Sequence, residues 1–205
     1  MGKRPRRGQT GDVVVAAGSE GSTSVAPDAL VVRPWRVEDA QAMHAAIIES
    51  VEHLRPWMPW IADEPQTVEQ RRELIAGWRS LWDAGDRVYG MFVGDEAVGG
   101  CGLHARIGAG GLEIGYWVRA GRTGRGYATA ASRRLTDAAF ADPRIDRVEI
   151  RHDATNEPSS RIPAKLGYVR VDDLRRPPVA PAETGLDHVW RVTREAWLTR
   201  SGSSG

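Results

Sequence analysis

The sequence of 205 residues contains one cysteine, Cys101, and no long apolar run. A single cysteine excludes an internal disulfide and a cluster of cysteine metal ligands, and we expect no metal site. No segment approaches the roughly 18 apolar residues of a membrane span, and no signal peptide opens the chain. We therefore expect a soluble, cytoplasmic protein without a membrane partner. In the run GCGLH, Cys101 is expected to be a buried strand thiol.

The sequence also has no excess of charge of either sign, with 28 basic residues against 27 acidic ones. Four of the basic residues stand in the first 28 positions, a segment rich in Gly, Ser, Thr and Ala where we expect a disordered tail. Residues 29–205 hold the other 24 basic residues and 24 of the acidic ones, so they carry no excess positive charge, which argues against nucleic-acid binding. We expect one domain over residues 29–198 and a flexible tail over residues 199–205.

The spacing of apolar residues predicts an α/β protein, in the α+β sense, with one mixed sheet that is mostly antiparallel and is flanked by helices. Thr67 and Gln70 form a predicted capping box at the start of the second helix. The expected strands are 30–34, 87–93, 97–104, 113–118, 147–151, 168–171 and 188–192, and the expected helices are 37–50, 67–84, 128–140 and 158–165.

A glycine-rich turn lies between the strand-like run at 111–118 and the helix-like run at 128–140. Glycine lets the backbone approach a ligand, and the free N–H groups and dipole at a helix start favour phosphate oxygens. A Walker loop is excluded because no Lys-Ser/Thr pair follows the last glycine. The turn therefore predicts a pyrophosphate site, the alternative being a turn that needs glycine only for positive φ. Its residues are Gly124, Arg125, Gly126, Tyr127, Ala128 and Thr129.

A second motif, with Asn156, Ser159 and Arg161, follows the strand-like run RVEIRHD. Together the two segments resemble the GCN5-related N-acetyltransferase (GNAT) superfamily, over roughly residues 30–197. The segments LEIGYW and LDHVW resemble its RimJ/RimL branch. The resemblance implies acetyl-CoA as acyl donor and a primary amine as acceptor, attacked directly in a ternary complex.

The resemblance also implies which residues hold the donor. The backbone of the turn would bind the pyrophosphate, and the backbone of Trp117 and Val118 would pair with the pantetheine arm. Asn156 would fix that arm through its amide, unless it serves only as a turn former. Thr123 departs from the Gln or Arg that the family often has there, a charge that Arg122 and Arg125 could supply. The remaining implied donor contacts are Ser159 and Arg161.

Two residues are candidates for catalysis. The resemblance implies that Glu113 removes a proton from the amine, the alternative being a strand glutamate that faces water. It implies that Ser159 donates a hydrogen bond to the departing CoA sulfur, although a serine there could also cap the following helix. His104 and His188 are expected to be structural. Glu183 lies near, but not at, the position of a second glutamate base in some relatives.

The acceptor is expected to bind at Trp57, Trp60 and Tyr89. The two tryptophans could form an aromatic wall for it, although tryptophans at this spacing could instead anchor the loop. Arg175 and Arg176 could bind an acceptor carboxylate. The acceptor is expected to be either a protein N-terminal α-amine or a small amine such as an antibiotic. In the second case the donor could be an acyl-CoA other than acetyl-CoA. A non-catalytic acyl-CoA-binding module is the alternative from a different class. Exposed sheet edges would allow a homodimer.

Overall fold

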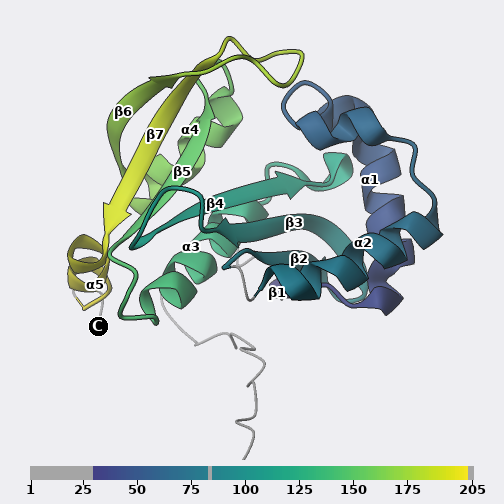
Figure 1. Cartoon of the computed structure of the whole chain (residues 1–205), viewed down its shortest axis with the longest axis horizontal. Helices are drawn as coiled ribbons and strands as arrows, with labels where there is room; N and C mark the ends of the chain where they lie inside the picture. The colour runs from purple at the N-terminus through teal and green to yellow at the C-terminus, as the bar shows by residue number, and fades with distance from the viewer. Residues whose placement is uncertain (1–29, 83–84, 203–205) are drawn as a thin grey trace, which may run out of the picture.

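The computed structural model describes residues 30–82 and 85–202, and the expected tail over residues 1–28 lies outside them. Seven described strands form one sheet in the order β1-β2-β3-β4-β5-β7-β6 (Figure 1). Their bounds are β1 (Leu30–Pro34), β2 (Arg87–Val93), β3 (Glu96–His104), β4 (Gly111–Val118), β5 (Arg147–Asp153), β6 (Val169–Arg175) and β7 (Leu186–Thr193). Neighbouring strands are antiparallel except β4 and β5, which confirms a mixed and mostly antiparallel sheet.

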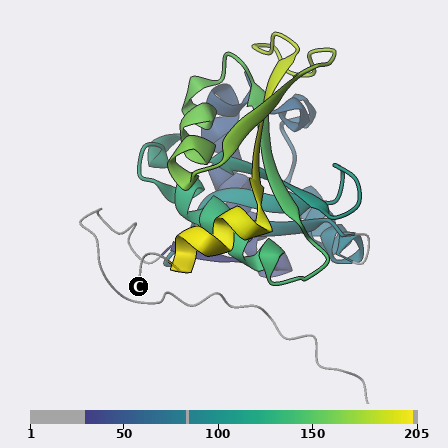
Figure 2. The same cartoon turned by 90° about the vertical axis from the view of Figure 1, so that its left-hand side faces the viewer.

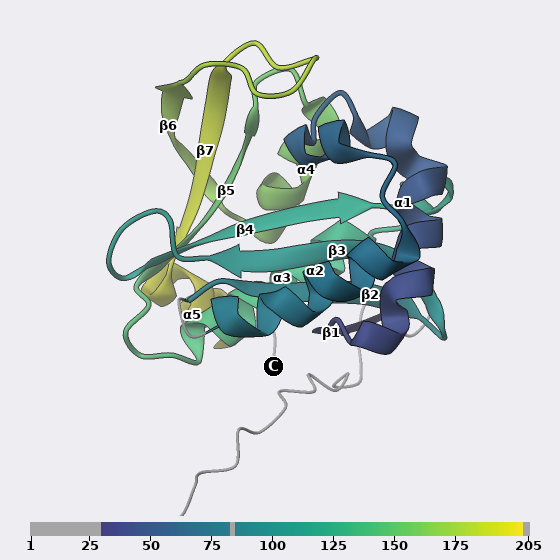
Figure 3. The ribbon, with the colours of Figure 1, turned by 45° about the vertical axis from the view of Figure 1, so that its right-hand side comes forward.

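Helices cover both faces of the sheet. The described helices are α1 (Ala40–Leu54), α2 (Val68–Leu81), α3 (Tyr127–Phe140), α4 (Glu157–Leu166) and α5 (Arg194–Gly202), with 3-10 turns η1 (Val37–Asp39), η2 (Pro59–Asp63) and η3 (Ala120–Arg122). Figure 3 shows α1 and α2 in front of β2 and β3, and α3 behind the sheet. Each face has its own apolar core, because side chains alternate between the two faces along a strand. Ile114 and Leu135 belong to the core under α3, whereas Trp117 packs on the core under α1.

The sheet opens between β4 and β5, its one parallel pair of described strands. Their pairing runs only from Gly111 with Arg147 to Ile114 with Ile150. Beyond this point β4 stays with β3, and β5 stays with β7 as far as Asp153. The carboxyl ends of the two strands therefore diverge and leave a V-shaped opening (Figure 1).

The predicted capping box at the start of α2 is confirmed. Gln70 N–H donates to Thr67 Oγ1 at 3.2 Å, and Thr67 N–H donates to Gln70 Oε1 at 2.7 Å. The helix then ends at Leu81, before the expected end near residue 84. At the other helix predicted near the N-terminus, the first turn is the 3-10 turn η1, so α1 itself begins at Ala40.

Helix α5 was not predicted, and it takes in residues 199–202, which the sequence analysis assigned to a flexible tail. It follows β7 directly and packs at the end of the sheet (Figure 2). The Trp197 side chain is buried in the core under α3, and its indole N–H donates to Asp137 Oδ1 at 2.7 Å. Among the described residues, no helix is both long and apolar enough to span a membrane.

Candidate functional site

A cavity of about 840 Å³ occupies the opening between β4 and β5. It crosses the plane of the sheet, because it is lined by Tyr116 and Ser159 on the α3 side and by Glu113 and Trp117 on the opposite side. The connector after α1 and the loop between β6 and β7 also line it, together with residues of α1, α2, β2, β3 and β5. The same space therefore meets two chemically different sets of side chains.

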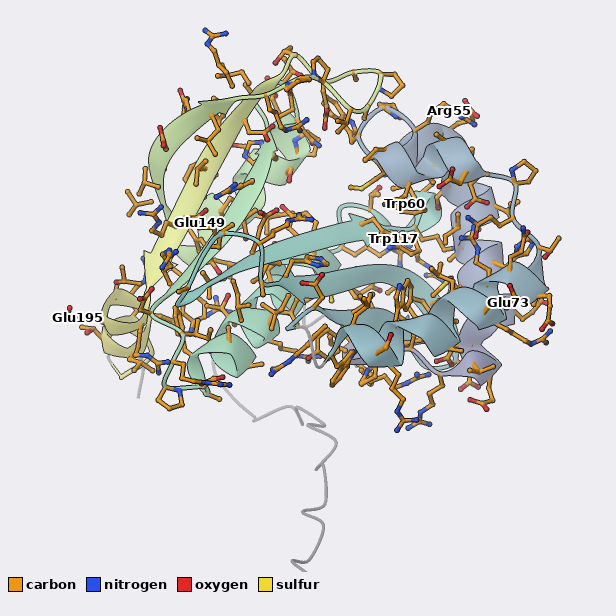
Figure 4. All side chains as sticks on the ribbon, in the orientation of Figure 1. Arg55, Trp60, Glu73, Trp117, Glu149 and Glu195 are labelled. Atoms are coloured by element: carbon orange, nitrogen blue, oxygen red, sulfur yellow. The ribbon has the colours of Figure 1, made fainter. Side chains whose placement is uncertain are left out.

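An aromatic wall forms on the α1 side of this cavity. Trp57 and Trp60 line it as predicted, and the Trp60 ring lies edge-on to Trp117 with centroids 6.0 Å apart (Figure 4). Gly100 makes room for Trp117, since a Cβ there would lie 2.5 Å from the indole nitrogen. Tyr89 does not join them, because it packs on Trp82 at 5.5 Å and is absent from the described cavity lining. Tyr89 therefore lies away from the place expected for an acceptor-binding residue.

On the α3 side, β4 and α4 are joined by two hydroxyl groups. Tyr116 Oη lies 2.7 Å from Ser159 Oγ, and it also donates to the Ser159 carbonyl at 3.3 Å. Burial raises the pKa of Tyr116 well above its ordinary value, against the effect of the Ser159 hydrogen bond, so its hydroxyl keeps its proton. Tyr116 was not predicted as a site residue, because only the fold brings the start of α4 next to this side chain of β4.

The start of α4 places Ser159 in the helix rather than at its cap. Asn156 is the N-cap, and its Oδ1 accepts the N–H of Ser159 at 3.3 Å. The capping role that the sequence allowed for a serine thus belongs to Asn156. This leaves the Ser159 hydroxyl to the cavity and the Tyr116 hydroxyl.

Glu113 is buried at the cavity wall, so the alternative of a strand glutamate facing water is wrong. Its carboxylate forms an ion pair with Arg106, and Arg151 Nε lies 3.7 Å from its other oxygen. Arg151 in turn pairs with the buried Glu149 at 2.8 Å. Glu113 therefore belongs to a charged network across β4 and β5, and its carboxylate already has a cationic partner.

The loop between β6 and β7 closes the cavity on the side of α1. The Ala182 N–H donates to the Pro56 carbonyl at 3.0 Å and so ties this loop to the connector after α1. Arg176 forms ion pairs with Glu183 at 2.8 Å and with Asp187 at 2.5 Å. These pairs occupy the guanidinium, which the sequence suggested as a partner for an acceptor carboxylate. Burial acts to raise the pKa of Glu183, but hydrogen bonds from Arg176 and from the N–H groups of Val179 and Ala180 hold it below its ordinary value. Glu183 is thus a structural carboxylate of the loop.

Asp153 anchors the other end of the same loop. It accepts hydrogen bonds from Thr155 and from the N–H groups of Thr184 and Gly185, at 2.7 to 3.1 Å. Burial acts to raise the pKa of Asp153, but these hydrogen bonds outweigh it and lower the pKa to about 2. The side chain is therefore ionised throughout the neutral range and fixes the loop.

Replacing Asp153 with asparagine is expected to lower the free energy of unfolding at neutral pH by about 2 kcal/mol, because asparagine cannot accept all of these bonds. The folded pKa lies below the unfolded value, so the stabilisation is complete above about pH 4 and is lost as the pH falls through about 2. Urea unfolding of both proteins over this range measures the difference. Asp173→Asn removes an exposed carboxylate that pairs with Arg170 and is the control. It should lower the free energy of unfolding much less. A loss for Asp153→Asn that does not depend on pH would contradict this account.

The glycine-rich turn lies at the start of α3. Gly124 and Gly126 have φ of 74° and 80°, a left-handed conformation that disfavours other residues. The first ladder bond runs from Ala130 N–H to the Gly126 carbonyl at 2.9 Å, so the preceding N–H groups have no partner within the helix. A Cβ added at either glycine would meet no atom within 4 Å. The turn is therefore an open set of donors for an anion.

The side chains around the turn contribute less than its backbone. Tyr127 and Ala128 are buried, so only their N–H groups can face a ligand. Arg122 forms an ion pair with Glu96 and cannot supply the missing charge without leaving it. Thr123 Oγ1 donates to the Ala120 carbonyl at 3.3 Å. Arg125 and Thr129 complete the turn, and Arg161 is exposed on α4.

The cysteine behaves as predicted from its context. Cys101 is buried in β3, and burial raises the pKa of its thiol to about 12. A thiol that stays protonated is a poor nucleophile, so the described site has no cysteine suited to covalent catalysis.

Comparison with known proteins gives four informative likenesses. The family model described as "Acetyltransferase (GNAT) domain" matches residues 29–169. YdaF of Bacillus subtilis (strain 168), whose name describes it as a ribosomal N-acetyltransferase, is 29% identical over 149 residues, 71% of this chain and 81% of YdaF. Among solved structures, RimL, a ribosomal L7/L12 α-N-protein acetyltransferase in complex with CoA, superposes with a TM-score of 0.73 and 18% identity, covering 82% of this chain and 95% of RimL. RimJ of Mycobacterium smegmatis, in complex with CoA-disulfide, has a TM-score of 0.68 and 24% identity, covering 84% and 89%. The last two show a shared fold.

Proposed function

Because the chain belongs to the family of GNAT acetyltransferases, we propose that this acetyl-CoA-dependent N-acetyltransferase modifies the N-terminal α-amine of a protein. The observation that carries the proposal is the cavity through the sheet, with a hydroxyl pair on one side and an aromatic wall on the other. The name of YdaF and the fold shared with RimL and RimJ support a protein acceptor. The loop tied to Pro56 borders the cavity on the side of α1, where a slender group such as a chain end would enter.

Acetyl-CoA would enter on the α3 side. Its pyrophosphate would lie on the N–H groups from Gly124 to Thr129, where two left-handed glycines leave room. The diverging end of β4 offers backbone groups of Trp117 and Val118 to the pantetheine amides, as an added strand would use them. Asn156 could reach this arm with its amide nitrogen, because only its oxygen is used in the cap. The thioester would then arrive beside Ser159.

The reaction requires a neutral amine and a stabilised leaving group. The α-amine has a reference pKa of about 8, so most of it is protonated at neutral pH and must lose a proton before attack. Ser159 would donate its hydroxyl hydrogen to the departing thiolate once the Tyr116 hydroxyl turns from the Ser159 carbonyl to donate to Ser159 Oγ, which lies 2.7 Å away. The catalytic role of Glu113 stays a prediction, in view of its ion pair with Arg106.

The test measures binding of acetyl-CoA and CoA by calorimetry and then thiol release with two acceptor panels. Peptides with free N-termini form the first panel, and small amines including aminoglycosides and polyamines form the second. Release with peptides but not with N-terminally blocked copies would support the proposal. Release only with small amines would replace it by the small-amine alternative, which the aromatic wall also suits. Tight CoA binding without release to any amine would indicate a binding module.

A further inference from the structure

Deprotonation of the acceptor amine calls for a base on the α1 side of the cavity. Resting on the proposed N-acetyl transfer, we propose that His104 is that base and that the amine is held over Gly115 when it gives up its proton. His104 ends β3 and is the register partner of Glu113 on β4, so both side chains face the same side of the sheet. Both also line the cavity.

Glu113 is less suitable than His104 as the base. Arg106 is paired with its carboxylate, and Arg151 Nε lies 3.7 Å away, so a proton transferred to Glu113 would have to displace a favourable ionic contact. No cation of the described residues is paired with His104 Nε2. Its Nδ1 lies 3.7 Å from Asp86 Oδ1, and that oxygen is held by the Ala105 N–H at 2.9 Å. This arrangement favours the proton on Nδ1 and leaves the Nε2 lone pair for the cavity.

The glycines beneath the imidazole indicate where a substrate lies. A Cβ at Gly102 would be 2.8 Å from His104 Nε2, so packing requires that glycine. A Cβ at Gly115 would meet only the same imidazole, at 3.6 Å from Nε2, and Gly115 has no positive φ. Neither the backbone nor the packing therefore explains Gly115, and glycine inside a strand often marks the close approach of a ligand. That position is next to Nε2, where the sheet opens.

The protonation state suits this role. Burial lowers the pKa of His104 below its ordinary value, and Arg106 acts in the same direction. Asp86 and Glu113 act in the opposite direction without reversing the shift. The described charged groups that act on the ring are thus Asp86 in the segment before β2, Arg106 in the loop after β3, and Glu113 on β4. The imidazole is consequently neutral at neutral pH and able to accept a proton.

The ammonium loses one proton to His104 Nε2, which passes it to solvent, and the nitrogen lone pair forms the N–C bond to the acetyl carbon. The nitrogen loses a second proton to solvent as the C–S bond breaks with its electron pair on sulfur. The thiolate, hydrogen-bonded by Ser159, finally takes a proton from water, so one proton is released per acetyl group transferred.

The experiment compares kcat/KM across about pH 5.5 to 9.5 for wild type and three variants on an acceptor that wild type uses. In His104→Gln, kcat/KM should fall about a hundredfold at neutral pH and less above the pKa of the amine. The decrease of kcat/KM at low pH that protonation of His104 causes, its acid limb, should also be absent. Glu113→Gln should lose less than about tenfold and keep that limb. His188→Gln is the matched control, because His188 pairs with Asp173 and is outside the described cavity lining. Its kcat/KM should equal that of wild type at every pH.

A His104→Gln enzyme with the wild-type rate and acid limb would overturn the inference, as would loss of that limb in Glu113→Gln. Thermal unfolding and CoA binding separate a folding defect from a catalytic one. If His104→Gln fails to fold, Gly115→Ala decides: it should raise the acceptor KM at least about tenfold and leave CoA affinity unchanged. Lost CoA affinity with an unchanged acceptor KM would instead place the donor over Gly115 and refute the inference. Wild type that releases no CoA with any acceptor would overturn the proposed function, and this inference with it.

Discussion

Replacement of Ser159 by alanine is expected to lower kcat about a hundredfold and to leave the affinity for CoA nearly unchanged. The reason is that its hydroxyl would contact the sulfur only as negative charge develops there, so its loss affects the transition state more than the bound donor. Single-turnover release of thiol measures the chemical step, and calorimetry measures CoA binding. Because Asn156 and not Ser159 caps α4, the substitution should leave the helix intact.

Tyr116→Phe should give a smaller loss, about tenfold, because Ser159 keeps its own hydrogen but loses the donor that orients it. Tyr168→Phe is the matched control, since Tyr168 is also buried and its hydroxyl lies 2.6 Å from Thr136 Oγ1, outside the cavity lining. Both variants lose a buried hydrogen bond, but only the first should lower kcat. Unchanged turnover in a folded Ser159→Ala protein would remove Ser159 from the mechanism.

The second large effect is expected for Gly126→Val, which should abolish measurable binding of acetyl-CoA. Valine at a φ of 80° is strained by at least about 1–2 kcal/mol, and its side chain would project at the helix start where the phosphates would lie. Calorimetric titration with CoA and with 3′-dephospho-CoA tests whether the loss concerns the shared pyrophosphate.

Gly94→Val controls for the strain itself. Gly94 has a φ of 57° in the hairpin between β2 and β3, and a Cβ there also meets no atom within 4 Å. This variant should lose similar stability in thermal unfolding and keep its affinity for CoA. Equal loss of CoA binding in both variants would mean that strain, and not the turn, explains the effect at Gly126.

Local signals in the sequence predicted the fold well. The capping box of Thr67 and Gln70, the neighbouring strands at 87–93 and 97–104, and the glycine turn before α3 all depend on residues close together in the chain, and the structure has all three. The mixed, mostly antiparallel character of the sheet followed from the order of the elements and from the family resemblance, whereas the order of the strands in the sheet was not predicted.

What the sequence did not predict depends on contacts between distant residues. The contact of Tyr116 with Ser159 spans 43 positions, and the direction of Tyr89 depends on which strand face α1 and α2 cover. Arg176 was considered as a ligand-binding residue because the sequence does not indicate which carboxylates a charged loop residue contacts, and its partner Glu183 appears only in the structure. Helix α5 is short, with little amphipathic pattern, and its Trp197 contacts a core built from remote segments.

The opening between β4 and β5 has a consequence for kinetics and for inhibitor design. Under the proposed function, donor and acceptor approach from opposite faces of one sheet, so neither product blocks the exit of the other, and release in either order is expected. A single molecule that joins CoA to an acceptor peptide would have to pass between two strands to occupy both sites. Its linker could therefore be no thicker than the gap left where pairing stops, after Ile114 and Ile150.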